Sequence, residues 1–119
     1  MTDHISQKNP LLLAFIGDAV HTLFVREQLS THDAKISQIH KLASDTLCAT
    51  AQAKRFDQIY DILTEVERDI ATRARNAPHN TAPKSCTLGD YHKATALEAV
   101  IGYNHLGGNA NRVKELIQC

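Results

Sequence analysis

Residues 11–20 read LLLAFIGDAV, where an uninterrupted apolar run ends at Gly17 and Asp18. Pro10 stands where the first turn of a helix tolerates proline, so we predict a helix over residues 10–29. A helix that is apolar on every side is normally buried, here both in its own domain and against a partner. The stretch therefore predicts a central helix that carries an aspartate in apolar surroundings.

A second stretch, TALEAVIGYNHLGG at residues 95–108, also sets one acid, Glu98, among apolar residues. It predicts a helix over residues 88–106 that the following pair of glycines terminates. Glycine inside a helix costs about 1 kcal/mol relative to alanine. Gly17 and Gly102 are therefore expected where two helix backbones approach closely.

The rest of the chain predicts further helices and no strand. Residues 34–56 carry apolar side chains at helical spacing, and Thr64 with Glu67 has the spacing of a capping box. The fold class is therefore all-α, in a single domain over residues 1–119. The expected segments are a flexible tail over 1–8, helices over 10–29, 34–56, 64–77, 88–106 and 109–119, a connection over 57–63 and a loop over 78–88.

The composition is that of one ordinary globular domain, with 43% hydrophobic and 22% charged residues. Thirteen basic residues balance thirteen acidic ones, which argues against a uniformly basic nucleic-acid binder. This balance hides an acidic segment at residues 57–69 beside a basic one at 71–84. The three cysteines form no CxxC pair and no apolar run is long enough to span a membrane, so we expect a cytoplasmic location and no membrane partner.

Asp18 and Glu98 are anomalous, because burying an unpaired carboxylate costs several kcal/mol. Two explanations remain open. The two helices bring both acids into one cleft that holds a divalent cation, for which Mg²⁺ is suited because it needs only one or two carboxylates. Alternatively, each acid pairs with a neighbouring base such as Arg26, Lys93 or an arginine of residues 73–75.

These stretches resemble the ribonuclease III family, and in particular its Mini-ribonuclease III branch. The similarity covers about residues 9–118, and the short chain without an appended double-stranded-RNA-binding domain is also the pattern of that branch. LAFIGDAV resembles the signature helix of the family, and ALEAVIGYNHLGG resembles its second acidic helix. The segments similar to the Mini-ribonuclease III branch are IHKLAS at 39–44, AQAKRF at 51–56, and RARNA at 73–77 followed by PHNTAPKS at 78–85.

The resemblance implies a homodimer of helical subunits that hydrolyses double-stranded RNA with Mg²⁺, with Mn²⁺ as a substitute. Precursor ribosomal RNA (23S) is the implied substrate, with a ribosomal protein as a potential helper. By position, Asp18 and Glu98 would be the catalytic residues and metal ligands. Ala14 and Thr95 stand where full-length enzymes of the family have further acids, as in the Mini-ribonuclease III branch. Thr95 would orient a water in the site, or is simply a structural threonine.

The basic loop region supplies the candidates for RNA binding, because A-form RNA is recognised mainly through phosphate and 2′-hydroxyl contacts. A solvated loop is the alternative interpretation. Lys54 and Arg55 are weaker candidates, and His21 is more simply a structural histidine than a neighbour of the metal. The predicted RNA-binding residues are Arg73, Arg75, Asn76, His79 and Lys84.

The dimer is predicted through the first long helix, at Leu12, Phe15 and Ile16, because one small domain cannot easily cover this much apolar surface. Two competing functions remain open. In the first, the chain is a non-catalytic RNA-binding or ribosome-associated relative, which the missing acids at Ala14 and Thr95 favour. Otherwise it is a helical protein-interaction domain whose acids are paired structurally.

Overall fold

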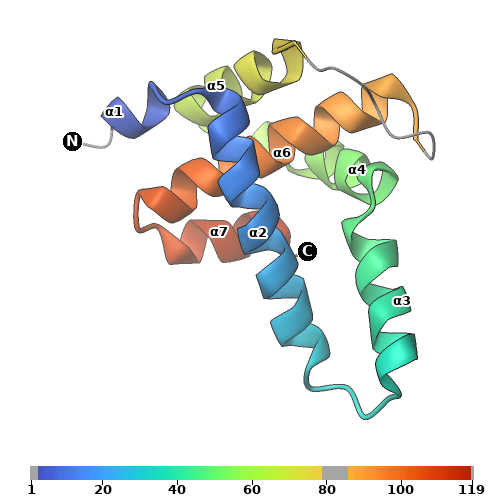
Figure 1. The fold of residues 1–119 in the computed structure, drawn as a ribbon. Helices are drawn as coiled ribbons and strands as arrows, with labels where there is room; N and C mark the ends of the chain where they lie inside the picture. The colour runs from blue at the N-terminus through green and yellow to red at the C-terminus, as the bar shows by residue number, and fades with distance from the viewer. Residues whose placement is uncertain (1–2, 79–85, 119) are drawn as a thin grey trace.

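The structure is a computed structural model that describes residues 3–78 and 86–118. These residues form helices and no strand, which confirms the all-α prediction. Among the helices of these two segments, none combines the length and apolar character needed to cross a bilayer. The elements are α1 (Asp3–Ser6), α2 (Pro10–Leu29), α3 (Ile36–Leu47), α4 (Ala49–Ile59), the 3-10 turn η1 (Tyr60–Ile62), α5 (Glu65–Asn76), α6 (Leu88–Leu106) and α7 (Ala110–Ile117), shown in Figure 1.

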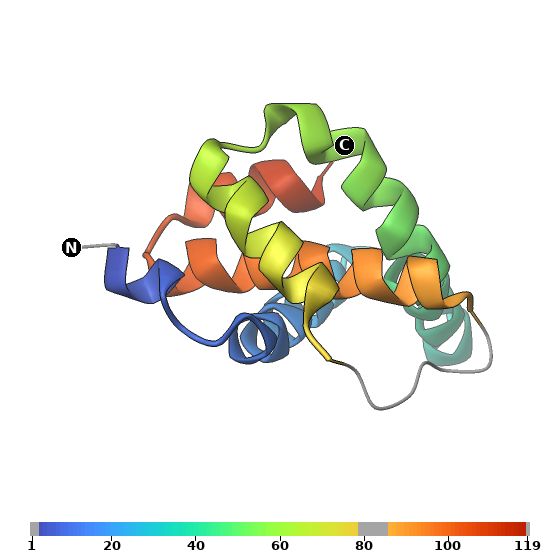
Figure 2. The ribbon, with the colours of Figure 1, turned by 90° about the horizontal axis from the view of Figure 1, so that it is seen from above.

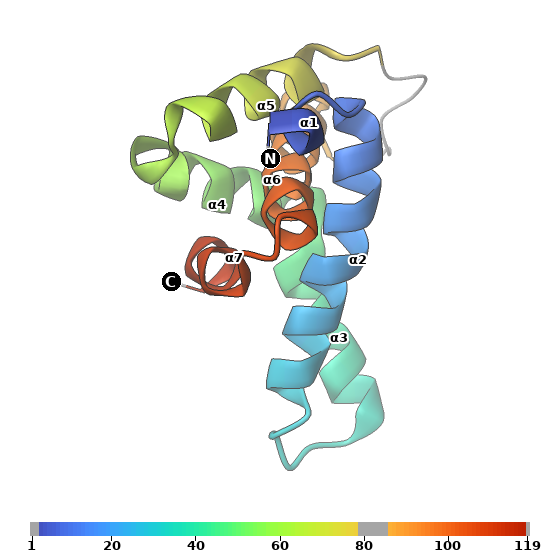
Figure 3. The same ribbon diagram turned by 90° about the vertical axis from the view of Figure 1, so that its left-hand side faces the viewer.

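Helix α6 is the centre of the molecule. Figure 2 shows it running between α5 on one side and α2 on the other, and Figure 3 shows it end-on with α4 and α7 closing the remaining side. Leu97, Val100 and Ile101 on α6 are fully buried. Most of the helix is enclosed by its neighbours, which explains why the residue 95–104 stretch is mainly apolar, whereas His105 and Leu106 at its end are exposed.

Helices α2 and α6 cross at two glycines, as the sequence predicts. A Cβ atom added at Gly17 would lie 1.7 Å from the carbonyl oxygen of Glu98. One added at Gly102 would lie 2.0 Å from the carbonyl oxygen of Leu13. The backbones of the two helices are therefore in direct contact, and only glycine permits this at either position.

The single helix predicted over residues 34–56 is wrong. Cys48 has an extended backbone (φ −64°, ψ 157°) that ends α3 and begins α4 in a new direction. Helix α3 lies beside the C-terminal half of α2, whereas α4 packs on α6 (Figure 1). The break lets the two halves of this amphipathic stretch pack against different partners.

Part of the segment predicted as a flexible tail over residues 1–8 is the helix α1. The guanidinium of Arg73 donates a hydrogen bond of 2.6 Å to the carbonyl oxygen of Ser6. Ser6 itself is buried. The start of the described chain is therefore anchored to α5.

Glu67 joins α5, α6 and α7. It completes the predicted capping box, because the amide of Thr64 donates to its Oε1 at 2.8 Å while its own amide donates to Thr64 Oγ1 at 3.1 Å. Its side chain is only 2% exposed, and it accepts a bond of 2.8 Å from Asn104. Arg112 of α7 holds both carboxylate oxygens, at 2.6 and 3.0 Å.

Glu67→Gln is expected to lower the free energy of unfolding at pH 7 by about 3 kcal/mol, because it removes the buried charge partner of Arg112 and leaves that guanidinium only the exposed Glu115. Burial alone would raise the pKa of Glu67, but the bonds from Arg112, Thr64 and Asn104 outweigh burial and lower it. This stabilisation is therefore complete above the ordinary pKa of 4.5 and is lost as the pH falls through the lower folded-state value. Urea unfolding of wild type and variant at pH 7 and in acid measures both effects.

The exposed neighbour Glu65, in the same first turn of α5, provides the control. Glu65→Gln is expected to change the unfolding free energy by only a few tenths of a kcal/mol. The interpretation of Glu67 is rejected if the difference between Glu67→Gln and wild type stays constant from pH 7 into acid.

Candidate active site

The crossing of α2 and α6 brings the two predicted acids together. Asp18 follows Gly17 directly, and Glu98 lies one helical turn before Gly102, so both side chains extend from the point of backbone contact. The Asp18 carboxylate lies close enough to Glu98 for its charge to raise the pKa of the Glu98 carboxyl group. Asp18 is exposed and Glu98 is partly buried. The pair therefore has one face toward solvent, where a substrate can reach it.

The pair binds a proton more strongly than ordinary carboxylates do. Burial, followed by the charge of Asp18 and its hydrogen bond, raises the pKa of Glu98 to about 8, while a hydrogen bond from Gln52 opposes the shift. Near neutral pH, Glu98 is therefore largely protonated.

Asp18 and Glu98 do not form structural ion pairs with the basic residues that the structure describes, so this alternative is wrong for those residues. Lys93 binds Asp57 at 2.9 Å, and Arg73 binds Asp69 at 3.0 Å. No lysine or arginine of residues 3–78 and 86–118 forms an ion pair with Asp18 or Glu98. The positive charge that would normally compensate two adjacent acids is not supplied by these side chains.

The donor set suits a divalent cation with hard-ligand preferences. Mg²⁺ is commonly held by one or two carboxylates while it keeps several waters. Across the described residues no group of three or more His, Cys, Asp and Glu side chains is placed to hold a metal, so Asp18 and Glu98 would act as a two-carboxylate site. Because ligands bind metals in their deprotonated form, a cation here would displace the proton of Glu98.

Two buried polar side chains, Gln52 and His21, border the acidic pair. Gln52 of α4 donates from Nε2 to Glu98 Oε2 at 3.4 Å. Burial lowers the pKa of His21 to about 4, although the Asp18 charge opposes this shift and Arg55 adds to it, so His21 is neutral at physiological pH. The sequence offered no signal for the contact of Gln52, apart from its place in a segment with family resemblance.

Thr95 lies one turn before Glu98 and is buried. Its hydroxyl donates to the carbonyl oxygen of Tyr91 at 3.0 Å, within α6. Its hydrogen is therefore used by the helix, and only the oxygen lone pairs remain to accept a hydrogen bond from a water. Its role in orienting water stays a prediction.

The predicted RNA-binding residues that the structure describes differ in their exposure and contacts. Arg75 and Asn76 are exposed at the end of α5, with no ion pair in the described segments. Arg73 is partly occupied by Asp69 and the carbonyl of Ser6. The other two predicted residues, His79 and Lys84, lie outside the described residues.

The two weaker candidates also differ. Lys54 is exposed on α4. Arg55 instead donates to carbonyl oxygens at the end of α7, to Leu116 at 2.9 Å, to Glu115 at 3.1 Å and also to Gln118. Arg55 therefore caps the C-terminus of α7, where a positive charge also favours the helix dipole.

The predicted dimer residues lie on a face of α2 that α6 does not cover. Phe15 is 73% exposed and Leu12 is 46% exposed, whereas Ile16 is half-buried. Leu23 continues the same stripe two turns further on and is also exposed. Figure 3 shows α2 at the edge of the molecule. These residues form an apolar stripe whose exposure a single chain does not explain.

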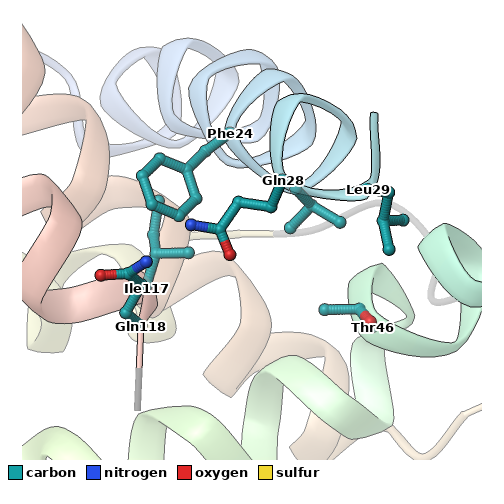
Figure 4. A pocket seen from close by; sticks show the side chains of 7 residues that line it. Phe24, Gln28, Leu29, Thr46, Ile117 and Gln118 are labelled. Carbon is teal, nitrogen blue, oxygen red and sulfur yellow. The ribbon is translucent and has the colours of Figure 1, made fainter. Parts of the chain in front are cut away.

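A separate cleft of about 460 Å³ lies between the C-terminal half of α2, α3 and the end of α7 (Figure 4). Its wall includes Phe24, Gln28, Thr46 and Ile117 and has no charged side chain. It therefore lacks the carboxylates that a magnesium site requires, and the acidic pair remains the candidate centre.

Comparison with known proteins supports the same assignment. A family model described as Ribonuclease III domain matches residues 11–109. A Mini-ribonuclease 3 of Thermoanaerobacter sp. (strain X514) is 40% identical over 111 residues, which are 92% of this chain and 78% of the relative. A Mini-ribonuclease 3 of Symbiobacterium thermophilum is 40% identical over 110 residues, 92% of this chain and 85% of the relative. The crystal structure of a Fusobacterium nucleatum protein matches with a TM-score of 0.87 and 34% identity, over 92% of this chain and 88% of that one.

The family model spans α2 and α6 entirely, apart from the first residue of α2, so the match includes the glycine crossing and both acids. The relatives match almost the whole chain and most of their own length. The chain therefore belongs to the ribonuclease III family and, within it, to the Mini-ribonuclease 3 group.

Proposed function

We propose that this chain is a Mg²⁺-dependent enzyme that hydrolyses phosphodiester bonds of double-stranded RNA as a homodimer, with Mn²⁺ as a substitute metal. Membership of the ribonuclease III family makes it an RNA endonuclease. The observation that carries the finer proposal is the pair Asp18 and Glu98, which lie together at the crossing of α2 and α6 and have no basic partner among the described residues. The proposed role is maturation of precursor 23S ribosomal RNA in the cytoplasm, with a ribosomal protein as a potential helper.

Each acid has a distinct place in this chemistry. Asp18 is exposed and so is the ligand nearest the RNA, while Glu98 is held from behind by Gln52. Glu98 would hold the cation in its deprotonated form. When bound, Mg²⁺ favours attack of water on phosphorus and stabilises the charge on the departing oxygen. The Thr95 oxygen, one turn from Glu98, would accept a hydrogen bond from a water in the site.

Incubation with a long perfect RNA duplex tests the proposal. We expect internal cleavage with Mg²⁺ or Mn²⁺, none with EDTA, and much slower cleavage of either strand alone. A duplex that is bound but not cut in any of these metals would favour the non-catalytic RNA-binding relative, which the missing acids at Ala14 and Thr95 support. Absence of both binding and cleavage would favour the protein-interaction domain.

Phe15→Glu is expected to convert a dimer into a monomer. A charge placed at the most exposed position of the apolar stripe would have to be buried unpaired in the interface. Sedimentation at micromolar concentration should give wild type at twice the 13.2 kDa chain mass and the variant at the single mass. Leu88→Glu is the control, since Leu88 is also an exposed apolar residue but lies at the start of α6. A wild-type mass of one chain would overturn the dimer.

Arg75→Ala is expected to weaken binding of any RNA duplex, whatever its sequence. Arg75 is exposed beside the basic loop, and binding to a phosphate contributes affinity that falls with salt. The slope of log K against log salt should decrease by about one for each phosphate that the variant no longer binds. Lys114→Ala, on the exposed face of α7, removes the same charge and should leave the slope unchanged. Equal slopes for wild type and Arg75→Ala would reject a role for Arg75 in phosphate binding.

A further inference from the structure

Gln52 connects the acidic pair to the break between α3 and α4. Its side chain is only 4% exposed. Its Nε2 donates to the carbonyl oxygen of Leu47 at 2.9 Å and to Glu98 Oε2 at 3.4 Å. Leu47 is the last residue of α3, so one amide group joins the end of that helix to the acid on α6. The break at Cys48 is what brings Gln52 to face Glu98.

The orientation of this amide follows from its two partners. A backbone carbonyl only accepts hydrogen bonds, so the Gln52 side chain must present its NH2 group to Leu47. Nε2 must therefore face Leu47 and Glu98, which leaves Oε1 of Gln52 buried with no hydrogen-bond partner in the described chain. The Nδ1 atom of His21, which also borders Asp18, is likewise buried with no hydrogen-bond partner in the described chain.

A buried polar atom without a partner costs about 1–3 kcal/mol, and such atoms are few in folded proteins. An apolar side chain of the same length would avoid this cost at Oε1. Apart from the contact with Glu98, it would lose only the hydrogen bond to Leu47 at a helix end. What only Gln52 provides is a donor aimed at the carboxylate of Glu98. Groups of this kind orient metal ligands in many sites, and their removal typically lowers metal affinity or activity about 10–100-fold.

We propose that Gln52 is a positioning residue that orients the Glu98 carboxylate toward the divalent cation. This inference rests on the proposed function, since it presupposes that the acidic pair binds metal. With one oxygen of Glu98 held by the amide, the other is directed toward Asp18 and the cation. The 3.4 Å bond is expected to shorten when the carboxylate is fully ionised, because hydrogen bonds to charged acceptors are shorter.

Gln52→Met tests the proposal, because methionine keeps the length of the side chain and removes the donor. The dissociation constants of Mn²⁺ and Mg²⁺ are measured by calorimetry without RNA, together with thermal unfolding in EDTA. We expect the metal dissociation constant to rise about tenfold or more. Cleavage should then need correspondingly more Mg²⁺ and recover at high Mg²⁺, while the KM for RNA stays the same. Gln38→Met, at an exposed glutamine of α3, should match wild type in each of these measurements.

A purely structural role would give a different result. It would lower the unfolding temperature in EDTA and leave the metal dissociation constant of the folded variant unchanged, which would overturn the proposal. Wild type that binds neither Mn²⁺ nor Mg²⁺ would overturn the proposed metal site and this inference together. Wild type that binds metal with the same affinity as folded Gln52→Met would overturn only this inference.

A measurement on the wild-type protein covers the case in which Gln52→Met does not fold. The side-chain amide of Gln52 gives its own pair of NMR signals, which can be followed while Mg²⁺ is added. We expect the Nε2 protons to shift in step with metal binding, because a cation held by the Glu98 carboxylate changes the environment of the amide that donates to it. Signals that stay fixed while metal binds would overturn the proposal.

Discussion

Asp18→Asn is expected to reduce Mg²⁺-dependent RNA cleavage about a thousandfold or more while the protein stays folded. The substitution removes the exposed member of the proposed metal site, to which the described residues contribute two carboxylates. A metal ion contributes several kcal/mol of charge stabilisation to such a reaction, and each 1.4 kcal/mol or so changes the rate about tenfold. The rate is measured in single turnover on a duplex at saturating enzyme.

The stability of the same variant separates the two explanations for the acids. Asp18 raises the pKa of Glu98 through its charge, so removing this charge relieves a repulsion in the metal-free protein. Unfolding by urea in EDTA should therefore show Asp18→Asn to be as stable as wild type or more stable. A clear loss of stability with unchanged cleavage would mean that Asp18 is a structural residue. Asp57→Asn, which breaks the exposed pair with Lys93, controls for loss of one acidic charge and should keep full activity.

Gly17→Ala and Gly102→Ala are each expected to unfold the domain or leave it without fixed packing at 25 °C. The new methyl carbon would lie 1.7 or 2.0 Å from a backbone carbonyl oxygen of the opposite helix. A backbone atom cannot rotate away as a side chain can, so the helices must separate along their whole contact. The loss is comparable to the total stability of a small domain, about 5–15 kcal/mol. Circular dichroism melting and the dispersion of NMR signals report it.

A loss of stability would be informative, because helix propensity alone predicts that these substitutions stabilise the protein. Glycine to alanine in a helix interior normally stabilises by about 1 kcal/mol. Gly89→Ala, in the first turn of α6, provides the control, since its nearest atom, Thr87 Oγ1, is 3.9 Å from the added carbon. It should melt at the same temperature as wild type or slightly higher. A folded Gly17→Ala with a wild-type melting temperature would contradict the backbone contact.

The sequence predicted the helices whose ends are set by residues at those ends. Pro10 begins α2, the capping box at Thr64 begins α5, and the glycine pair after Leu106 ends α6. The α3–α4 break was not predictable, because Cys48 is neither glycine nor proline and the helical spacing of apolar residues continues through it. That break depends on α4 packing against α6, which is a tertiary effect.

The candidate site also has contacts that the sequence predicted and contacts that it did not. The pairing of Asp18 with Glu98 was predictable, because each acid stands near a glycine in an apolar helix. The contact of Gln52 was not, since a buried glutamine has no sequence signature. Arg55 was misjudged because a basic side chain beside a helix end binds backbone carbonyls as readily as phosphates. Chemistry that depends on spacing along one helix is readable from sequence, whereas chemistry between helices usually is not.

The direct backbone contact at Gly17 and Gly102 has a consequence for the quality control of this enzyme in the cell. The distance between the backbones that carry its two acids is set by main-chain atoms, so only a change in the helix crossing can alter it. Any excursion that parts α2 from α6 also dismantles the acidic pair. Heat-damaged or incompletely folded copies should therefore be inert toward RNA, and the fraction of active enzyme should track the fraction of folded chains.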